Sequence, residues 1–138
     1  MDSDTWHGSG WPTSGRNPTE FAWLVKPDGR RDPALRSAAR NRRLANLPIG
    51  ITVAHGNHAW VLTGFSATAD PAKTDQFTVT SVRVTGPLWG PQNRTYGYDM
   101  HPDTKLTRKQ FKRFFTPWHY ARIRMVWEGR WVSVQPVP

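Results

Sequence analysis

The chain has 138 residues, with 19 Lys and Arg against 10 Asp and Glu, and it contains no cysteine. This length fits one domain, the lack of cysteine excludes a disulfide framework, and no apolar run approaches the roughly 18 residues of a membrane span. Twelve prolines and eleven glycines divide the chain into short segments, which argues against long helices. We therefore expect an α+β domain rich in short strands.

The N-terminal segment 1–17 is rich in Gly, Ser, Asp and Pro, which predicts a loop preceding one domain over 18–138. Asn17 is a favourable helix N-cap and Pro18 suits the first helical position, so a short helix is predicted as far as Val25. The segment lacks the basic and then apolar regions of a signal peptide. The sequence leaves the compartment open, with a cytoplasmic location if Met1 is the true start.

A second helix is predicted over "DPALRSAARNRRLANLP", because Asp32 can cap it, Pro33 can start it and Pro48 lies beyond its end. Its remaining positions are mostly arginine, so the helix is amphipathic with a narrow buried stripe. That stripe is predicted to hold Leu35, Ala38, Ala39, Arg42 and Ala45.

After Gly50 the pattern changes to β-branched and aromatic residues. Segments 49–54 and 58–67 are predicted strands joined by a tight turn at "HGN". A polar loop over 68–76 leads to a third strand over 77–86, whose alternation is interrupted by a possible bulge near Ser81.

A long Gly/Pro loop with aromatic residues then precedes "LTRKQFKRFFTPW", a predicted short helix. Thr107 and Gln110 form a capping box, Phe111 and the two phenylalanines after it supply the apolar face, and Pro117 stops the helix.

Two final strands, 121–127 and 130–136, are joined by "EG" and predict a hairpin in which Trp127 and Trp131 pack as a cross-strand pair. Short links between sequential strands favour an antiparallel pairing. The predicted fold is thus an antiparallel twisted β-sheet with two or three short helices.

His58 is the candidate catalytic residue, because it begins a buried strand and can act as a general base fixed at the edge of a cleft. The plain alternative is a buried histidine with a structural role. A catalytic base also needs an orienting carboxylate or amide, and the next strand ends at Gly86, which has no side chain to offer. That role is vacant, or it is filled by a backbone carbonyl, a water or a remote group such as Asp99.

These segments carry a family resemblance. "HAWVLTGFSATADPAKTDQFTVTSVRV", "YGYDMHPDT" and "QFKRFFTPW" follow "SGWPTSGRNPTEFAWLV" in an order that resembles the C-terminal, β-rich half of papain-like cysteine peptidases. The resemblance is to the bacteriocin-processing type, which cleaves double-glycine leaders, and especially to the peptidase-like domains common in actinobacteria. It covers most of the chain and is specific over 49–120.

The resemblance implies a Cys–His–Asp/Asn hydrolase of peptide or thioester-type bonds, a peptide or protein substrate and no cofactor. Its histidine maps onto His58, and its Asp or Asn position is Gly86 here. Its nucleophilic cysteine lies in an N-terminal half that this sequence does not contain, and no oxyanion-hole residue is assigned. Because thiolate chemistry needs a thiol, we expect an inactive fragment or pseudo-enzyme. The hydroxyls of Thr13 and Ser14 are poor substitutes.

Without its helical lobe such a sheet should expose apolar surface, so we also expect marginal stability and concentration-dependent association. A second candidate function is a non-catalytic domain that binds a peptide in the same cleft.

Two other site types are disfavoured by the sequence. The pair His55 and His58 has an H-x-x-H spacing, but no obvious third ligand joins it, so no metal site is predicted. Basic helix faces with aromatic residues nearby would suit a nucleic acid, although solvated surface arginines explain the same pattern. These faces comprise Arg36, Arg40, Arg42, Arg43, Lys105, Arg108, Lys109, Lys112 and Arg113.

Overall fold

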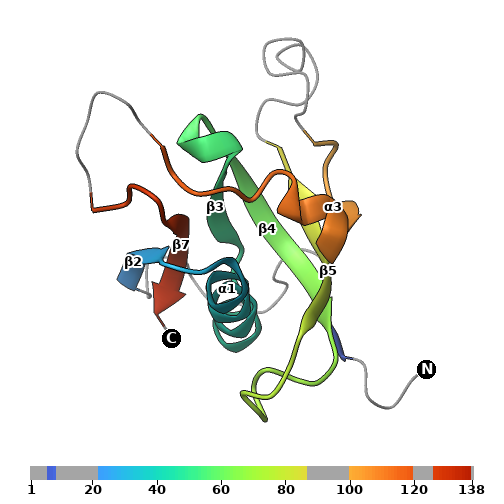
Figure 1. The fold of residues 1–138 in the computed structure, drawn as a ribbon. Helices are drawn as coiled ribbons and strands as arrows, with labels where there is room; N and C mark the ends of the chain where they lie inside the picture. Colours follow the sequence, from blue (N-terminus) through green and yellow to red (C-terminus); the bar gives the residue numbers. More distant parts are fainter. Residues whose placement is uncertain (1–5, 9–21, 87–99, 120–125, 138) are drawn as a thin grey trace.

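The computed structural model describes residues 6–8, 22–86, 100–119 and 126–137. Over these ranges the chain is an α+β fold in which the strands form one sheet and every strand pairing is antiparallel (Figure 1). The predicted α+β class and antiparallel sheet are therefore confirmed.

The described elements are two α-helices, one short 3-10 helix and seven strands. In chain order they are β1 (Trp6–Gly8), β2 (Ala22–Asp28), α1 (Arg31–Ala45), β3 (Ile49–Val53), η2 (Ala54–Gly56), β4 (His58–Ala67), β5 (Val79–Thr85), β6 (Thr104–Thr107), α3 (Arg108–Lys112) and β7 (Trp131–Val137). Neither α-helix of the described part combines the length and the apolar character needed to cross a bilayer.

The strand order across the sheet is β2-β7-β3-β4-β5-β6, and β1 pairs with the C-terminal end of β4. The central hairpin forms because β3 and β4 carry β-branched and aromatic residues at alternate positions. Its register pairs Ile51 with Trp60 and Val53 with His58. These four side chains are all buried on one face of the sheet.

Helix α1 packs across that face (Figure 1), and its small residues let it approach the strands closely. All five residues of its predicted stripe are buried, including Arg42. The helix begins one residue before Asp32, with Arg30 as N-cap and no side-chain cap bond, so the predicted capping role of Asp32 is wrong. Asp32 lies in the first turn instead, where a carboxylate complements the helix dipole.

Arg42 is buried because it holds a β-bulge in β4. The register against β5 shifts between Leu62 and Gly64, which leaves Thr63 as an extra residue. Arg42 Nε donates to the Thr63 carbonyl oxygen at 2.8 Å. The bulge turns the next core side chain, Phe65, back toward α1. A second register shift, after Ser66, falls where the sequence predicted a bulge near Ser81.

The predicted helix reaching Val25 is wrong over the described residues, because 22–28 form β2. Local capping signals favoured a helix, but pairing along the whole of β7 decides the conformation. The N-terminal loop prediction likewise fails at Trp6–Gly8, which form β1. The remaining residues of the predicted helix lie outside the described ranges.

The predicted C-terminal hairpin is also corrected. Val126 and Trp127 lie in a turn rather than a strand, and β7 pairs with β2 and β3. Trp127 packs edge-on against Trp118, with ring centroids 5.0 Å apart, so it does not form the predicted pair with Trp131. β6 was not predicted, because its four residues, TKLT, give too short an alternation.

The segment after α3 clamps the turn between β3 and β4. Figure 1 shows it running across the sheet to the end of β3, where η2 begins. Ala54 N donates to the Phe114 carbonyl oxygen at 2.9 Å, and His119 N donates to the His55 carbonyl oxygen at 3.0 Å. Gly56, at φ +86°, packs directly against the Trp118 ring.

A methyl group at Gly56 should break this clamp. An added Cβ would lie 2.7 Å from Trp118 Cδ2, in addition to the strain of a left-handed backbone. Gly129 is the matched control, because it also has a positive φ, +74°, but has open space around it. We expect Gly129→Ala to cost about 1–2 kcal/mol of unfolding free energy and Gly56→Ala about 1–3 kcal/mol more.

Urea denaturation, monitored by tryptophan fluorescence, measures the loss of unfolding free energy in both variants. Equal losses for the two variants would show that Trp118 does not pack on Gly56.

Candidate functional site

His58 lies at the first position of β4, directly after the clamped turn. Its residue is 8 % exposed, and its side chain shares the face of Trp60 and Leu62, since alternate residues of a strand point the same way. The neighbouring strand places Val53 opposite it. The histidine therefore lies at the start of a buried strand, the position that the sequence predicts for it.

The turn before His58 has an unusual backbone. Ala54, His55 and Gly56 all have positive φ values of 51°, 57° and 86°. Such a run is costly for residues with a side chain, so outside contacts must hold it. Besides the backbone bonds of the clamp, His55 N donates to Thr116 Oγ1 at 2.9 Å. The clamp thus fixes where β4 begins.

Gly86 follows the last residue of β5 and is buried. The β4–β5 ladder pairs Val61 with Thr85. Continuing that register would place Gly86 beside Trp60, on the face that also carries His58. Gly86 N donates to the Met100 carbonyl oxygen at 3.0 Å. The two predicted positions thus come from adjacent strands.

Trp60 lies between these two positions. Its side chain is 1 % exposed and packs on Phe114, with ring centroids 4.9 Å apart. Its Nε1–H is buried and has no hydrogen-bond acceptor among the described residues. A buried donor without an acceptor is costly, so the surroundings of His58 contain an unfilled polar position.

The other predicted site residues divide into two groups. Asp99, Thr13 and Ser14 lie outside the described ranges. His55 is exposed, and its Nδ1 lies 3.0 Å from the Pro117 carbonyl oxygen, which can only accept, so Nδ1 carries the proton. Within the described ranges no three His, Cys, Asp or Glu side chains gather as a metal site.

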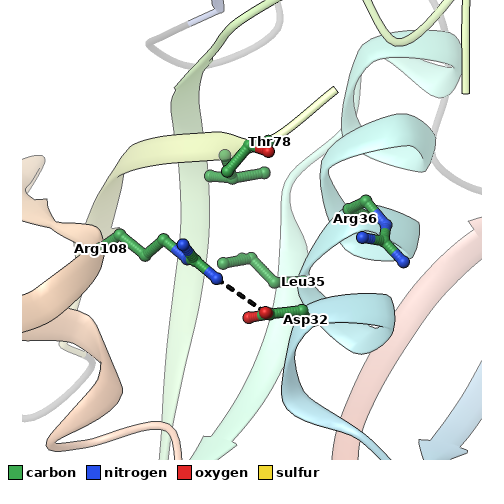
Figure 2. A pocket seen from close by; sticks show the side chains of 6 residues that line it. Asp32, Leu35, Arg36, Thr78 and Arg108 are labelled. Atoms are coloured by element: carbon green, nitrogen blue, oxygen red, sulfur yellow. Dashed lines mark hydrogen bonds and ion pairs between the residues drawn. The ribbon is translucent and has the colours of Figure 1, made fainter. Parts of the chain in front are cut away.

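A separate hollow lies between α1, the start of β5 and α3 (Figure 2). Asp32 and Arg108 meet across it, with Arg108 Nη2 donating to Asp32 Oδ2 at 2.7 Å. This hydrogen bond, joined by the positive charge of Arg108, lowers the pKa of Asp32 against the opposing effect of desolvation. Arg36 lines the same hollow from α1.

The basic faces are less uniform than the sequence suggested. Arg40 pairs with Asp75, and Arg43 pairs with Asp70 at 3.1 Å. Arg42 is buried, and burial lowers the pKa of its guanidinium. These contacts remove several arginines from a surface available to phosphates.

The hollow beside α1 was not predicted from the sequence. The available signal was the spacing of Asp32, Arg36 and Arg40, which are four residues apart and so share one exposed stripe of the helix. The partners Arg108 and Asp75 come from distant segments, and no local pattern reveals them.

Comparison with known protein families, with curated proteins and with solved structures finds no match to this chain.

The Asp32–Arg108 pair predicts a pH-dependent contribution to stability. Because folding depresses the pKa of Asp32, its contribution is complete above the unfolded value of about 3.9 and disappears as pH falls through the lower folded value. We expect Arg108→Met to lower the unfolding free energy by about 0.5 kcal/mol at pH 7, as for an exposed pair, and by nothing near pH 2.

Lys109→Met is the control, since it removes the same charge from the next, exposed position. Urea titrations of both variants across this pH range measure the effect. A loss that is the same at pH 2 and pH 7, or the same in both variants, would contradict it.

Proposed function

We propose that the chain is a cysteine-peptidase-like domain that provides the histidine side of a thiol–imidazole site and binds a peptide there without hydrolysing it. The observation that carries the proposal is His58, buried at the start of β4 and adjoining the strand that ends at Gly86. A base anchored by a strand and oriented from the next one is the arrangement that the sequence resemblance implies.

The absence of hydrolysis follows from chemistry. The chain has no cysteine, so His58 has no thiol to deprotonate. Gly86 offers no side chain to fix the imidazole tautomer, a role that a carboxylate or an amide fills in such sites. Binding is therefore the activity that we propose for the chain alone.

The Nε1–H donor of Trp60, which has no acceptor in the part of the chain that the structure describes, supports an incomplete site. Its buried Nε1–H needs an acceptor, and it lies two residues along the strand from His58. A peptide carbonyl or a group from a second lobe would satisfy it.

The edge strand β2 supports a missing covering element. Trp23, Leu24 and Val25 are 46 %, 49 % and 40 % exposed, three of the five large apolar side chains that are exposed in the described part. Successive strand residues point to opposite faces, so both faces of β2 are open here. A helical lobe of a papain-like domain, as the resemblance implies, is the element that we propose covers them.

A cysteine placed at position 86 tests whether this position adjoins His58. The natural chain has no thiol, so Gly86→Cys is a single-site probe, and Gly86 is not among the glycines with a positive φ. An adjacent imidazole promotes the reactive thiolate. We expect alkylation of this cysteine by iodoacetamide at pH 6.5 to be about tenfold faster than in the Gly86→Cys, His58→Ala double variant.

Thr85→Cys, on the opposite face of β5, is the control and should react at a rate that His58→Ala does not change. If His58→Ala leaves the rate at position 86 unchanged while the protein remains folded, the proposed site is wrong.

The exposed edge strand β2 predicts that copies of the chain associate with one another. We expect the sedimentation coefficient to rise with protein concentration, and Leu24→Lys to abolish this rise, because a charge on an edge strand opposes pairing between strands. Leu44→Lys, at an exposed apolar residue of α1, should leave the rise intact. A monomer at all concentrations would contradict the proposal that this edge needs a cover.

A further inference from the structure

The surface of α1 opposite its buried stripe borders three adjoining hollows. The first lies between α1 and α3, the second beside the loop before β5, and the third beside β2. Arg36 lines all three, and the second and third also share Asp75 and Phe77. We call the surface that these three neighbouring hollows make along the helix the α1 trough.

The α1 trough carries more positive than negative side chains. Its charged side chains are Lys26, Asp32, Arg36, Arg40, Asp75 and Arg108. Both carboxylates are already engaged, because Asp32 pairs with Arg108 and Asp75 pairs with Arg40.

Arg36 is left between these two pairs. Asp32 lies four residues before it on the helix, the spacing of a stabilising ion pair, but the carboxylate of Asp32 is bonded to α3 instead. Among the described residues Arg36 has no ion pair, and Figure 2 draws no interaction from its guanidinium to the other residues of the hollow. Its planar donors are suited to a carboxylate, which they bind in a bidentate manner.

The length of the α1 trough suits a short extended peptide. The trough follows α1 from Asp32 to Arg40, a rise of about 12 Å, which equals about four residues of extended chain. The exposed side chains of Gln76 and Thr78 border it and can bond to a peptide backbone. A nucleic acid fits less well, because Phe77 is 7 % exposed and too buried for bases to stack on it.

We propose that the α1 trough binds an extended peptide segment through an acidic side chain that pairs with Arg36. This site is distinct from the surroundings of His58 and does not rest on the function proposed for them.

The test is the binding of fluorescein-labelled hexaglutamate, measured by fluorescence anisotropy at low salt, with labelled hexaglutamine as the uncharged comparison. Arg36→Gln removes the charge at an exposed position without adding a new one. Arg113→Gln removes the same charge from the exposed C-cap of α3, outside the trough. His58→Ala reports on the other site.

We expect Arg36→Gln to weaken hexaglutamate binding about tenfold or more, as for the loss of a charge-assisted hydrogen bond. Arg113→Gln and His58→Ala should change it less than twofold, and hexaglutamine should not bind. No binding of hexaglutamate, or equal weakening by Arg36→Gln and Arg113→Gln, would overturn the proposal. So would a single-stranded oligonucleotide of equal charge that binds more tightly than hexaglutamate in an Arg36-dependent manner.

Discussion

The clamp between the β3–β4 turn and the segment after α3 is the constraint on which the rest of this structure depends. Three successive residues of the turn have left-handed backbones, a conformation that the isolated hairpin would not hold. Bonds from Phe114, Thr116 and His119 hold it, and Gly56 is required because the Trp118 ring lies against its backbone. The first residue after this turn is His58, so the clamp that stabilises the hairpin also positions the candidate site.

Much of the fold could be predicted from the sequence where local and long-range preferences agree. The buried stripe of α1 and the capping box of Thr107 and Gln110 follow from spacing alone, and both are present. The failures lie where long-range pairing decides the conformation. Residues 22–25 follow helix-start signals yet pair with β7, and the bulge at Thr63 depends on Arg42 of a distant helix. The position of His58 could be predicted because strand and turn signals meet there, whereas the α1 trough is built from four separate segments.

The surface around α1 and the neighbourhood of His58 differ in their polar groups. Around α1 most arginines are committed to carboxylates or to the core, since Arg40 and Arg43 bind aspartates and Arg42 binds a carbonyl oxygen. The net charge of +9 therefore overstates the basic surface that a polyanion would meet. Because its neighbours are paired, Arg36 is the distinct cation of this helix surface. Two residues along β4 from His58, the buried Nε1–H of Trp60 has no acceptor among the described residues.

The proposed site depends on the adjacency of His58 and the end of β5. A carbon-edited NOESY spectrum of the isotopically labelled protein tests it most directly, because the nearby Val61–Thr85 pair provides an internal reference in the same spectrum. We predict cross-peaks from the His58 ring protons to the Gly86 Hα protons, alongside the reference contacts between Val61 and Thr85. If the reference contacts are present and the ring of His58 shows none to Gly86, the two strands do not build a shared site and the proposed peptidase-like arrangement is contradicted.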